Sequence, residues 1–287
     1  MEKTLESLRQ RVQQIKKKRP GYGVVLDFFV QVRESQAASA ASSQVDSAKV
    51  IKAWQGRAAE EGFPLVQKDE FPIDMAASVS LFHKLCEIGK TANPGMAEQV
   101  EQIIKAFADA PVDLEKLLSG GGKEQTIEQF AADRNLDTQV LSFLVRSSTR
   151  PSIEAGREQL CGEVELKAWR QHYCPVCGSQ PSLSLLKGEG GVRHSLCSYC
   201  GCQWRIDRLS CTVCGNKEQE TLQYFCGEGE EVYRIDLCDK CHHYIKTIDY
   251  RGLGEADPSL EDLATMHLDV VAAQKGYTRA VPDFWGA

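Results

Sequence analysis

Long apolar runs are missing from this 287-residue sequence. A helix that spans a bilayer needs about 20 consecutive apolar residues, and the longest candidate, GVVLDFFVQV, is interrupted by Asp27. The N-terminus, MEKTLESLRQRVQQIKKKRP, likewise lacks the apolar core and the small-residue cleavage site of an export signal. We therefore expect a cytoplasmic protein without membrane insertion, whose apolar segments form buried helices or strands.

An overall excess of basic residues is also missing. The net charge is -6, whereas a general nucleic-acid binder carries a basic face that neutralises phosphates. The run Lys16–Arg19 is a local exception that could dock an acidic partner. Its simpler interpretation is the solvated C-terminal end of a helix, where cations oppose the negative end of the helix dipole. We expect no nucleic-acid partner.

Catalytic motifs are missing as well. The three glycines Gly120–Gly122 precede Lys123, but they lack the GxxxxGK[ST] spacing of a phosphate loop and a preceding strand. We interpret them as a connector between helices. The sequence shows no catalytic triad and no motif for a metal site with an open coordination position, so we expect a protein that is not an enzyme.

Cysteine is scarce in the first 170 residues, which contain Cys86 and Cys161 alone. Within residues 97–107 the apolar side chains recur at i, i+3, i+4 and i+7, and Asn93-Pro94 supplies a helix start. Further helices are predicted near residues 4–18, 24–40, 47–61, 76–89, 124–133 and 137–147. This half of the chain should therefore be a helical bundle.

The pattern changes between about residues 171 and 250, where short alternating segments predict strands: SLSLL, VRHSL, QWRI, TLQYF and VYRI. One further helix should begin at Asp257-Pro258 and end at Gly276. The expected divisions are a helical domain at 1–170, one four-cysteine unit at 171–210, a second at 211–250, and a C-terminal helix and tail at 251–287.

Ten of the twelve cysteines lie in this second half, and eight of them form four CxxC pairs. Two intervening residues let both sulfurs reach one ion at about 2.3 Å, and two such pairs about 20 residues apart complete a four-thiolate site. The segment between the first two pairs predicts a hairpin, which returns its ends to one place. The last two pairs are also joined by a predicted hairpin, so the two halves of this region look like an internal duplication of one supersecondary unit.

Sequential pairing then predicts two mononuclear metal sites, although CxxC spacing alone leaves an interleaved arrangement open. The predicted ligands are Cys174, Cys177, Cys197 and Cys200 in the first site, and Cys211, Cys214, Cys238 and Cys241 in the second.

Two other chemistries are disfavoured. A thioredoxin-like redox pair starts a helix in a βαβ unit, whereas these pairs lie at hairpin turns. Structural disulfides are disfavoured by a reducing cytosol. Cys202 and Cys226, outside the pairs, are expected to be small apolar core residues, with a reactive thiol as the alternative for Cys202. Surface or supporting positions are expected for the histidines near the pairs: His172, His194, His242 and His243.

The sequence resembles the FdhE family of formate dehydrogenase accessory proteins. The motifs that carry the resemblance cover roughly the last 120 residues: CPVCGSQP, RHSLCSYCGCQW, RLSCTVCGN, LCDKCHHYIK and LATMHLDVVAAQKGYTR. Generic zinc ribbons would not share the trailing helix and the GYTR segment. The chain end, VPDFWGA, departs from the Asn-Pro-Phe-like end of the family.

The resemblance implies an α+β fold: an N-terminal all-α bundle, two tandem rubredoxin-like or zinc-ribbon β units and a C-terminal helix. It also implies a cytoplasmic maturation factor that binds the catalytic subunit of formate dehydrogenase before export, and it leaves room for self-association. Two mononuclear ions are expected, iron by family likeness, with zinc as the alternative because both suit four thiolates. The alternative function is electron transfer or thiol-redox chemistry by a rubredoxin-like protein.

Overall fold

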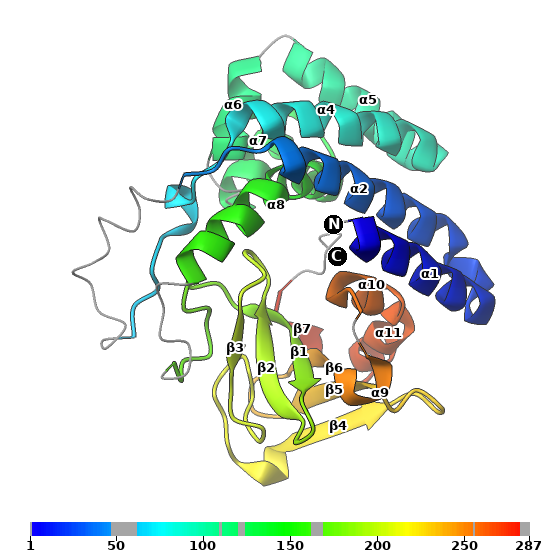
Figure 1. Ribbon diagram of the computed structural model, residues 1–287, viewed down its shortest axis with the longest axis vertical. Helices are drawn as coiled ribbons and strands as arrows, with labels where there is room; N and C mark the ends of the chain where they lie inside the picture. The colour runs from blue at the N-terminus through cyan, green and yellow to red at the C-terminus, as the bar shows by residue number, and fades with distance from the viewer. Residues whose placement is uncertain are drawn as a thin grey trace. The chain divides into compact units, whose positions relative to one another are not determined.

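The computed structural model describes residues 2–46, 62–108, 111–119, 124–161, 169–254 and 256–281. The chain divides into two units (Figure 1). The first comprises Met1–Trp54, Val66–Leu160 and Phe284–Ala287, and the second comprises Gln55–Leu65 and Cys161–Asp283. The helix predicted at 47–61, the glycine connector at 120–122 and the chain end from residue 282 lie outside the described residues.

The first unit is a helical bundle, as predicted. Its core is built from the apolar stripes that the sequence shows: Val100, Ile103 and Phe107 are all buried, and Phe107 stacks on Phe130 with ring centroids 5.0 Å apart. Its helices are α1 (Glu2–Lys18), α2 (Gly23–Ser42), α4 (Met75–Ala92), α5 (Pro94–Ala108), α6 (Pro111–Ser119), α7 (Glu124–Arg134) and α8 (Thr138–Cys161), of which the last residue, Cys161, already belongs to the second unit. Sequence periodicity did not predict α6.

Helix α2 contains the longest apolar run of the sequence. Leu26 and Phe29 are fully buried, whereas Asp27 faces outward and pairs with Lys16 of α1 at 2.8 Å. The basic residues Lys16–Lys18 form the last turn of α1, which agrees with the helix-end interpretation. Among the described residues, none of the helices combines the length and the apolar character needed to cross a membrane.

Helix α8 continues well beyond residue 147, where the sequence pattern ended it. Pro151 lies inside the helix and cannot donate a hydrogen bond to the carbonyl of Ser147, four residues earlier. The side-chain amide of Gln36 in α2 donates to that carbonyl instead, at 2.9 Å, and both groups are buried. A contact between residues distant in sequence therefore satisfies the group that proline leaves without a partner.

The second unit is built on one sheet with the order β3-β2-β1-β6-β5-β4, to which β7 adds through β6. Each four-cysteine unit supplies three consecutive strands that pair antiparallel. The strands are β1 (Pro181–Lys187), β2 (Val192–Cys197), β3 (Gln203–Arg205), β4 (Leu222–Cys226), β5 (Tyr233–Cys238), β6 (His243–Asp249) and β7 (Thr278–Arg279).

A parallel seam between β1 and β6 joins the two four-cysteine units. It runs from the pair Leu183–Lys246 to the pair Leu186–Asp249. The sequence pattern did not predict β6, although its segment HYIKTID carries β-branched residues in alternation. The two four-cysteine units therefore share one sheet instead of forming separate ribbons.

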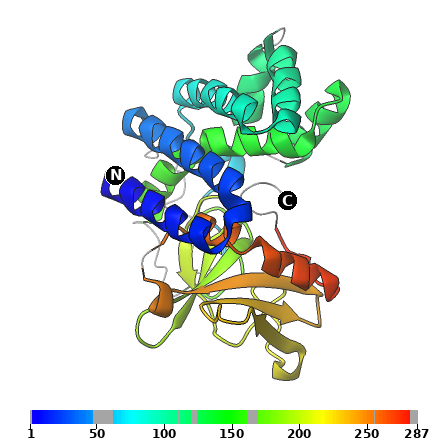
Figure 2. The same cartoon turned by 90° about the vertical axis from the view of Figure 1, so that its right-hand side faces the viewer.

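The predicted C-terminal helix is broken into α10 (Pro258–Leu263) and α11 (Met266–Gln274), after the short α9 (Tyr250–Leu253). The break lies at Thr265, whose hydroxyl donates to the carbonyl of Glu261 at 2.8 Å. Lys246 of β6 donates to the carbonyls of Asp262 and Thr265, at 2.9 and 3.3 Å. A buried lysine thus donates to carbonyls at the break. Helix α11 lies against the sheet (Figure 2), and its Leu268 belongs to the apolar core that the strands form.

Candidate metal centres

The four CxxC pairs adopt one common turn. In each pair, the residue after the second cysteine donates its backbone N–H to the carbonyl of the first cysteine. These donors all have positive φ, a conformation that glycine adopts without a steric penalty. They are Gly178, Gly201, Gly215 and His242, with φ of 72°, 70°, 75° and 56°.

Backbone N–H groups inside these turns point at the sulfurs. Val176 donates to Cys174 at 3.4 Å, and Val213 donates to Cys211 at 3.4 Å. Hydrogen bonds of this kind favour the thiolate over the thiol, because the donor dipoles compensate the negative charge. The turns therefore prepare the sulfurs to act as anionic ligands.

The first group contains Cys174, Cys177, Cys197 and Cys200, all of them buried. Its four sulfurs lie within 4.8 Å of one another; Cys177 Sγ lies 3.4 Å from Cys197 Sγ and 3.6 Å from Cys200 Sγ. A tetrahedral ion with metal–sulfur bonds of about 2.3 Å separates its ligands by about 3.8 Å. The two distances from Cys177 Sγ are within about 0.4 Å of that separation.

Electrostatics favour a cation in this first group. Burial raises the pKa of Cys174, Cys197 and Cys200, because a thiolate without a counter-ion is poorly solvated there. A bound divalent ion reverses this cost, since it compensates the charge of the thiolates directly. The chemistry of the donor set thus fits a metal.

The second group contains Cys211, Cys214, Cys238 and Cys241 and is more open. The sulfurs of Cys211 and Cys241 lie 3.7 Å apart, and those of Cys214 and Cys238 lie 3.8 Å apart. Cys214 is exposed and Cys241 is half-buried. Burial raises the pKa of Cys211 to about 11. The two groups therefore share a ligand geometry and differ in their access to solvent.

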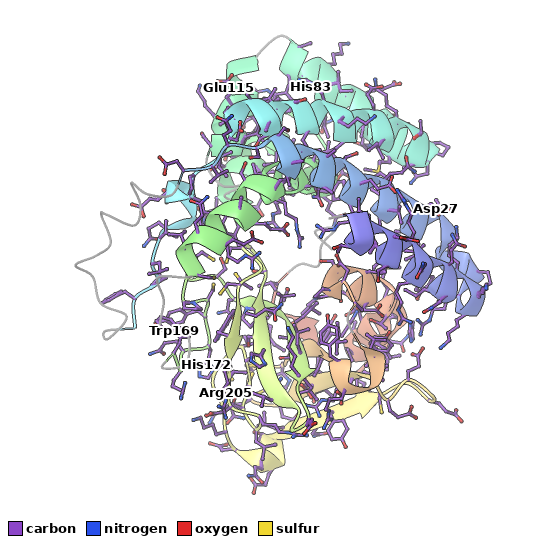
Figure 3. The ribbon with its side chains drawn as sticks, viewed as in Figure 1. Asp27, His83, Glu115, Trp169, His172 and Arg205 are labelled. Carbon is purple, nitrogen blue, oxygen red and sulfur yellow. The ribbon has the colours of Figure 1, made fainter. Side chains whose placement is uncertain are left out.

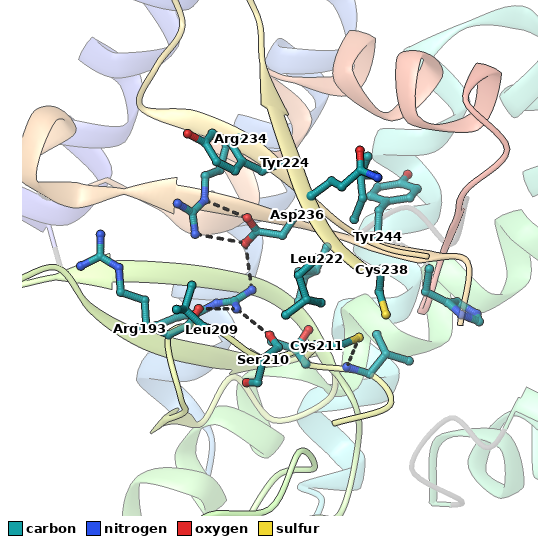
Figure 4. A pocket seen from close by; sticks show the side chains of 17 residues that line it. Arg193, Leu209, Ser210, Cys211, Leu222, Tyr224, Arg234, Asp236, Cys238 and Tyr244 are labelled. Atoms are coloured by element: carbon teal, nitrogen blue, oxygen red, sulfur yellow. Dashed lines mark hydrogen bonds and ion pairs between the residues drawn. The ribbon is translucent and has the colours of Figure 1, made fainter. Parts of the chain in front are cut away.

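A small pocket beside the second group shows how the two four-cysteine units are held together (Figure 4). Arg193 of β2 lines this pocket and forms an ion pair with Asp236 of β5 at 2.8 Å. Its guanidinium also donates to the carbonyl of Ser210 at 2.9 Å. Ser210 lies in the segment that connects the two four-cysteine units. Cys211 and Cys238 line the same pocket. Sequence patterns predicted a role for neither Arg193 nor Asp236.

The structure brings together the sulfurs of each predicted sequential group, and an interleaved grouping is not seen among the described residues. Cys202 is buried, as predicted, and its sulfur lies 3.4 Å from that of Cys161. The prediction that Cys226 is a core residue was wrong. Cys226 is exposed, because β4 is the last strand in the sheet order and much of it faces solvent.

The four histidines lie near the turns but outside both sulfur groups. His172, labelled in Figure 3, packs on the turn of the second group: a Cβ added to Gly215 would lie 2.5 Å from its Nε2. Burial lowers the pKa of His172. His243 Nδ1 lies 2.7 Å from the carbonyl oxygen of Cys241. His172 and His243 thus each contact a cysteine turn, and none of the four histidines belongs to either group of sulfurs.

The comparisons with known proteins agree with this arrangement. Residues 173–208 match the model of the FdhE central domain, and residues 209–285 match that of the FdhE C-terminal domain. A crystal structure of the FdhE protein from Pseudomonas aeruginosa superimposes with a TM-score of 0.73 over 99% of this chain and 95% of that chain, at 21% identity. This likeness supports the fold.

Two curated relatives are informative. The chain is 33% identical to an FdhE homolog of Stutzerimonas stutzeri over 117 residues, which is 39% of this chain and 38% of the relative. It is 30% identical to an FdhE homolog of Aquifex aeolicus over 230 residues, which is 79% of this chain and 75% of the relative. Because that match extends well beyond the cysteine-rich half, the chain belongs to the FdhE family.

Proposed function

We propose that this protein is a cytoplasmic accessory factor for formate dehydrogenase, which binds the catalytic subunit of that enzyme before export and performs no turnover itself. The observation that carries the proposal is the pair of four-sulfur groups in a chain of the FdhE family. A site with four protein ligands leaves no open coordination position for a substrate, so such a site serves structure, sensing or electron exchange.

Each group would hold one metal ion through its four thiolates. Iron is our first choice and zinc our second, because tetrahedral sites of four thiolates accept either. Metal analysis of anaerobically purified protein, combined with visible absorption, tests both the number and the identity. Two ions per chain are expected, and thiolate-to-iron absorption bands should accompany iron but not zinc.

Two matched substitutions test the independence of the groups. Cys177→Ser removes a ligand from the first group, and Cys214→Ser removes a ligand from the second. Each variant should retain about one metal per chain, because the ligand sets do not overlap. Loss of both metals from either variant would contradict two independent sites.

The accessory role is tested in cells. Deletion of the gene should abolish respiratory formate oxidation while synthesis of the catalytic subunit continues, and the tagged protein should capture that subunit from extracts. A strain that complements the deletion with the unaltered gene is the control. If formate oxidation survives deletion, the proposal fails.

Electron transfer is the second candidate, and one observation favours it: Cys214 of the second group is exposed. An exposed thiolate ligand gives an electron donor short access to a bound iron. Stopped-flow reduction of iron-loaded protein would separate the two functions. Turnover between oxidised and reduced iron at metabolic rates would favour electron transfer over the accessory role.

A further inference from the structure

Two cysteines outside the metal groups lie in direct contact. The sulfurs of Cys161 and Cys202 are 3.4 Å apart, and both residues belong to the second unit. Cys161 ends α8 and is half-buried, whereas Cys202 is 1% exposed and precedes β3. A disulfide bond is about 2.05 Å long, so a movement of little more than 1 Å would join these sulfurs.

The position of Cys202 is fixed by the first metal group. Its carbonyl accepts the backbone N–H of Cys197 at 2.9 Å. After the other pairs, the equivalent position is Ser179, Asn216 or His243. Ser179 accepts a hydrogen bond from Cys177 Sγ at 3.3 Å, and the amide of Asn216 lies 3.7 Å from Cys238 Sγ. A cysteine at this position replaces such a supporting group with a second thiol for Cys161.

We propose that Cys161 and Cys202 form a reversible dithiol–disulfide pair beside the first metal group, which reacts with low-molecular-weight disulfides such as oxidised glutathione while all eight metal ligands stay in place. This inference concerns residues that the proposed function does not use. It does not require that the partner be formate dehydrogenase.

Accessibility sets the order of the reaction. The half-buried Cys161 thiolate attacks one sulfur of the small disulfide, which forms a mixed disulfide and releases one small thiolate. Cys202 then attacks the Cys161 sulfur and displaces the second small thiolate. Two protein thiols are oxidised to one disulfide, one small disulfide is reduced to two small thiols, and the two protons pass to those thiols. Excess small thiol reverses both steps.

The test uses the full-length, metal-loaded protein. It is incubated with oxidised glutathione, its remaining thiols are alkylated, and its peptides are analysed by mass spectrometry while the metal content of the same sample is measured. A linked peptide containing Cys161 and Cys202 should form, disappear on treatment with dithiothreitol, and leave the metal content unchanged. Cys161→Ser should form no linked peptide.

Cys226→Ser is the matched control, because Cys226 is an exposed cysteine outside both groups. This variant should keep the Cys161–Cys202 link and lose only a glutathione adduct. A lasting glutathione adduct on Cys161 without a link would overturn the inference, and so would a link between Cys202 and a metal-group cysteine with loss of metal. If the link forms in a protein that binds no metal at all, the inference stands and the proposed metal sites fail.

Discussion

Arg193 Nη2 lies 2.8 Å from Asp236 Oδ2, and the arginine side chain is 3% exposed. This ion pair connects β2 of the first four-cysteine unit to β5 of the second. Asp236 also accepts hydrogen bonds from Arg234 and Thr247. Within the described residues, Asp236 is the one carboxylate that pairs with this buried guanidinium, so the junction depends on it.

Asp236→Asn should therefore destabilise the second unit. Removal of one partner leaves a buried charge without compensation, which costs about 3–5 kcal/mol. Chemical denaturation of the metal-loaded protein measures the loss. Asp207→Asn is the control, because Asp207 pairs with Lys217 on the surface at 2.8 Å, and an exposed pair contributes at most about 1 kcal/mol. Equal losses in both variants would refute a special role for the junction.

Gln36→Leu should destabilise the helical unit by about 1–3 kcal/mol, because it leaves the buried carbonyl of Ser147 without a donor. Pro151→Ala restores a backbone N–H at the position from which helices normally satisfy that carbonyl. The double variant should accordingly lose less stability than Gln36→Leu alone. Thermal unfolding monitors the series, with the exposed Gln14→Leu as the control. Strict additivity of the two changes would count against this account.

A chelator should remove the metal of the second group first. Cys214 is exposed and Cys241 is half-buried, whereas the first group is buried throughout. Release into a colorimetric chelator should show a fast and a slow phase of equal size. Cys214→Ser should lack the fast phase, and Cys177→Ser should lack the slow one. A single phase in the unaltered protein would show that exposure does not govern release.

Complete removal of metal should unfold residues 171–250 before the helical unit. The turns that close these strands each place two cysteines in a four-sulfur group, so bound metal would tie the strands together and supply much of their folding free energy. Limited proteolysis after chelation should cleave the cysteine-rich half first and leave a helical fragment, with re-metallated protein as the control. Uniform resistance along the chain would argue against this dependence.

Acid should weaken the contact between β6 and the C-terminal helices. Burial alone would raise the pKa of Asp262, but the positive charges of Lys246 and Arg279 hold that pKa below its usual range. A lowered carboxyl pKa contributes stability that is present above the unfolded value of about 3.9 and is lost as pH falls through the folded value.

Asp262→Asn should thus be less stable than the unaltered protein at neutral pH, and the difference should shrink below about pH 4. Denaturation measured at matched pH values checks this, because metal loss is common to both proteins and cancels in the comparison. A difference that stays constant with pH would exclude Asp262 as the responsible group.

Local signals predicted much of this molecule. The cysteine pairs could be grouped because a CxxC turn and a hairpin are decided by neighbouring residues, and the stripe of Val100, Ile103 and Phe107 reports a helix directly. The helical bundle, the sheet-forming half and the family were all accessible in this way.

Contacts between distant residues explain most of what was missed. The extension of α8 depends on Gln36, 111 residues before Ser147, and the break before α11 is accompanied by carbonyl contacts to Lys246. Cys226 was misplaced because a residue pattern does not show which strand ends a sheet. Arg193 could have been noticed from the sequence, because it places a charge in a short strand of otherwise uncharged residues. Its partner, Asp236, could not be predicted from the sequence pattern.

The parallel seam also bears on how such a chain stops growing. The first strand of one four-cysteine unit, β1, pairs with the third strand of the other, β6. The two outer strands are again a third strand, β3, and a first strand, β4. Head-to-tail pairing of this kind is open-ended in principle, since a further copy could add by the same contact. The outer strand β3 has three residues where β6 has seven. The seam itself uses four residues of β6, from Lys246 to Asp249, so a copy added at β3 would find a ladder at least one pair shorter than the one that joins the two four-cysteine units.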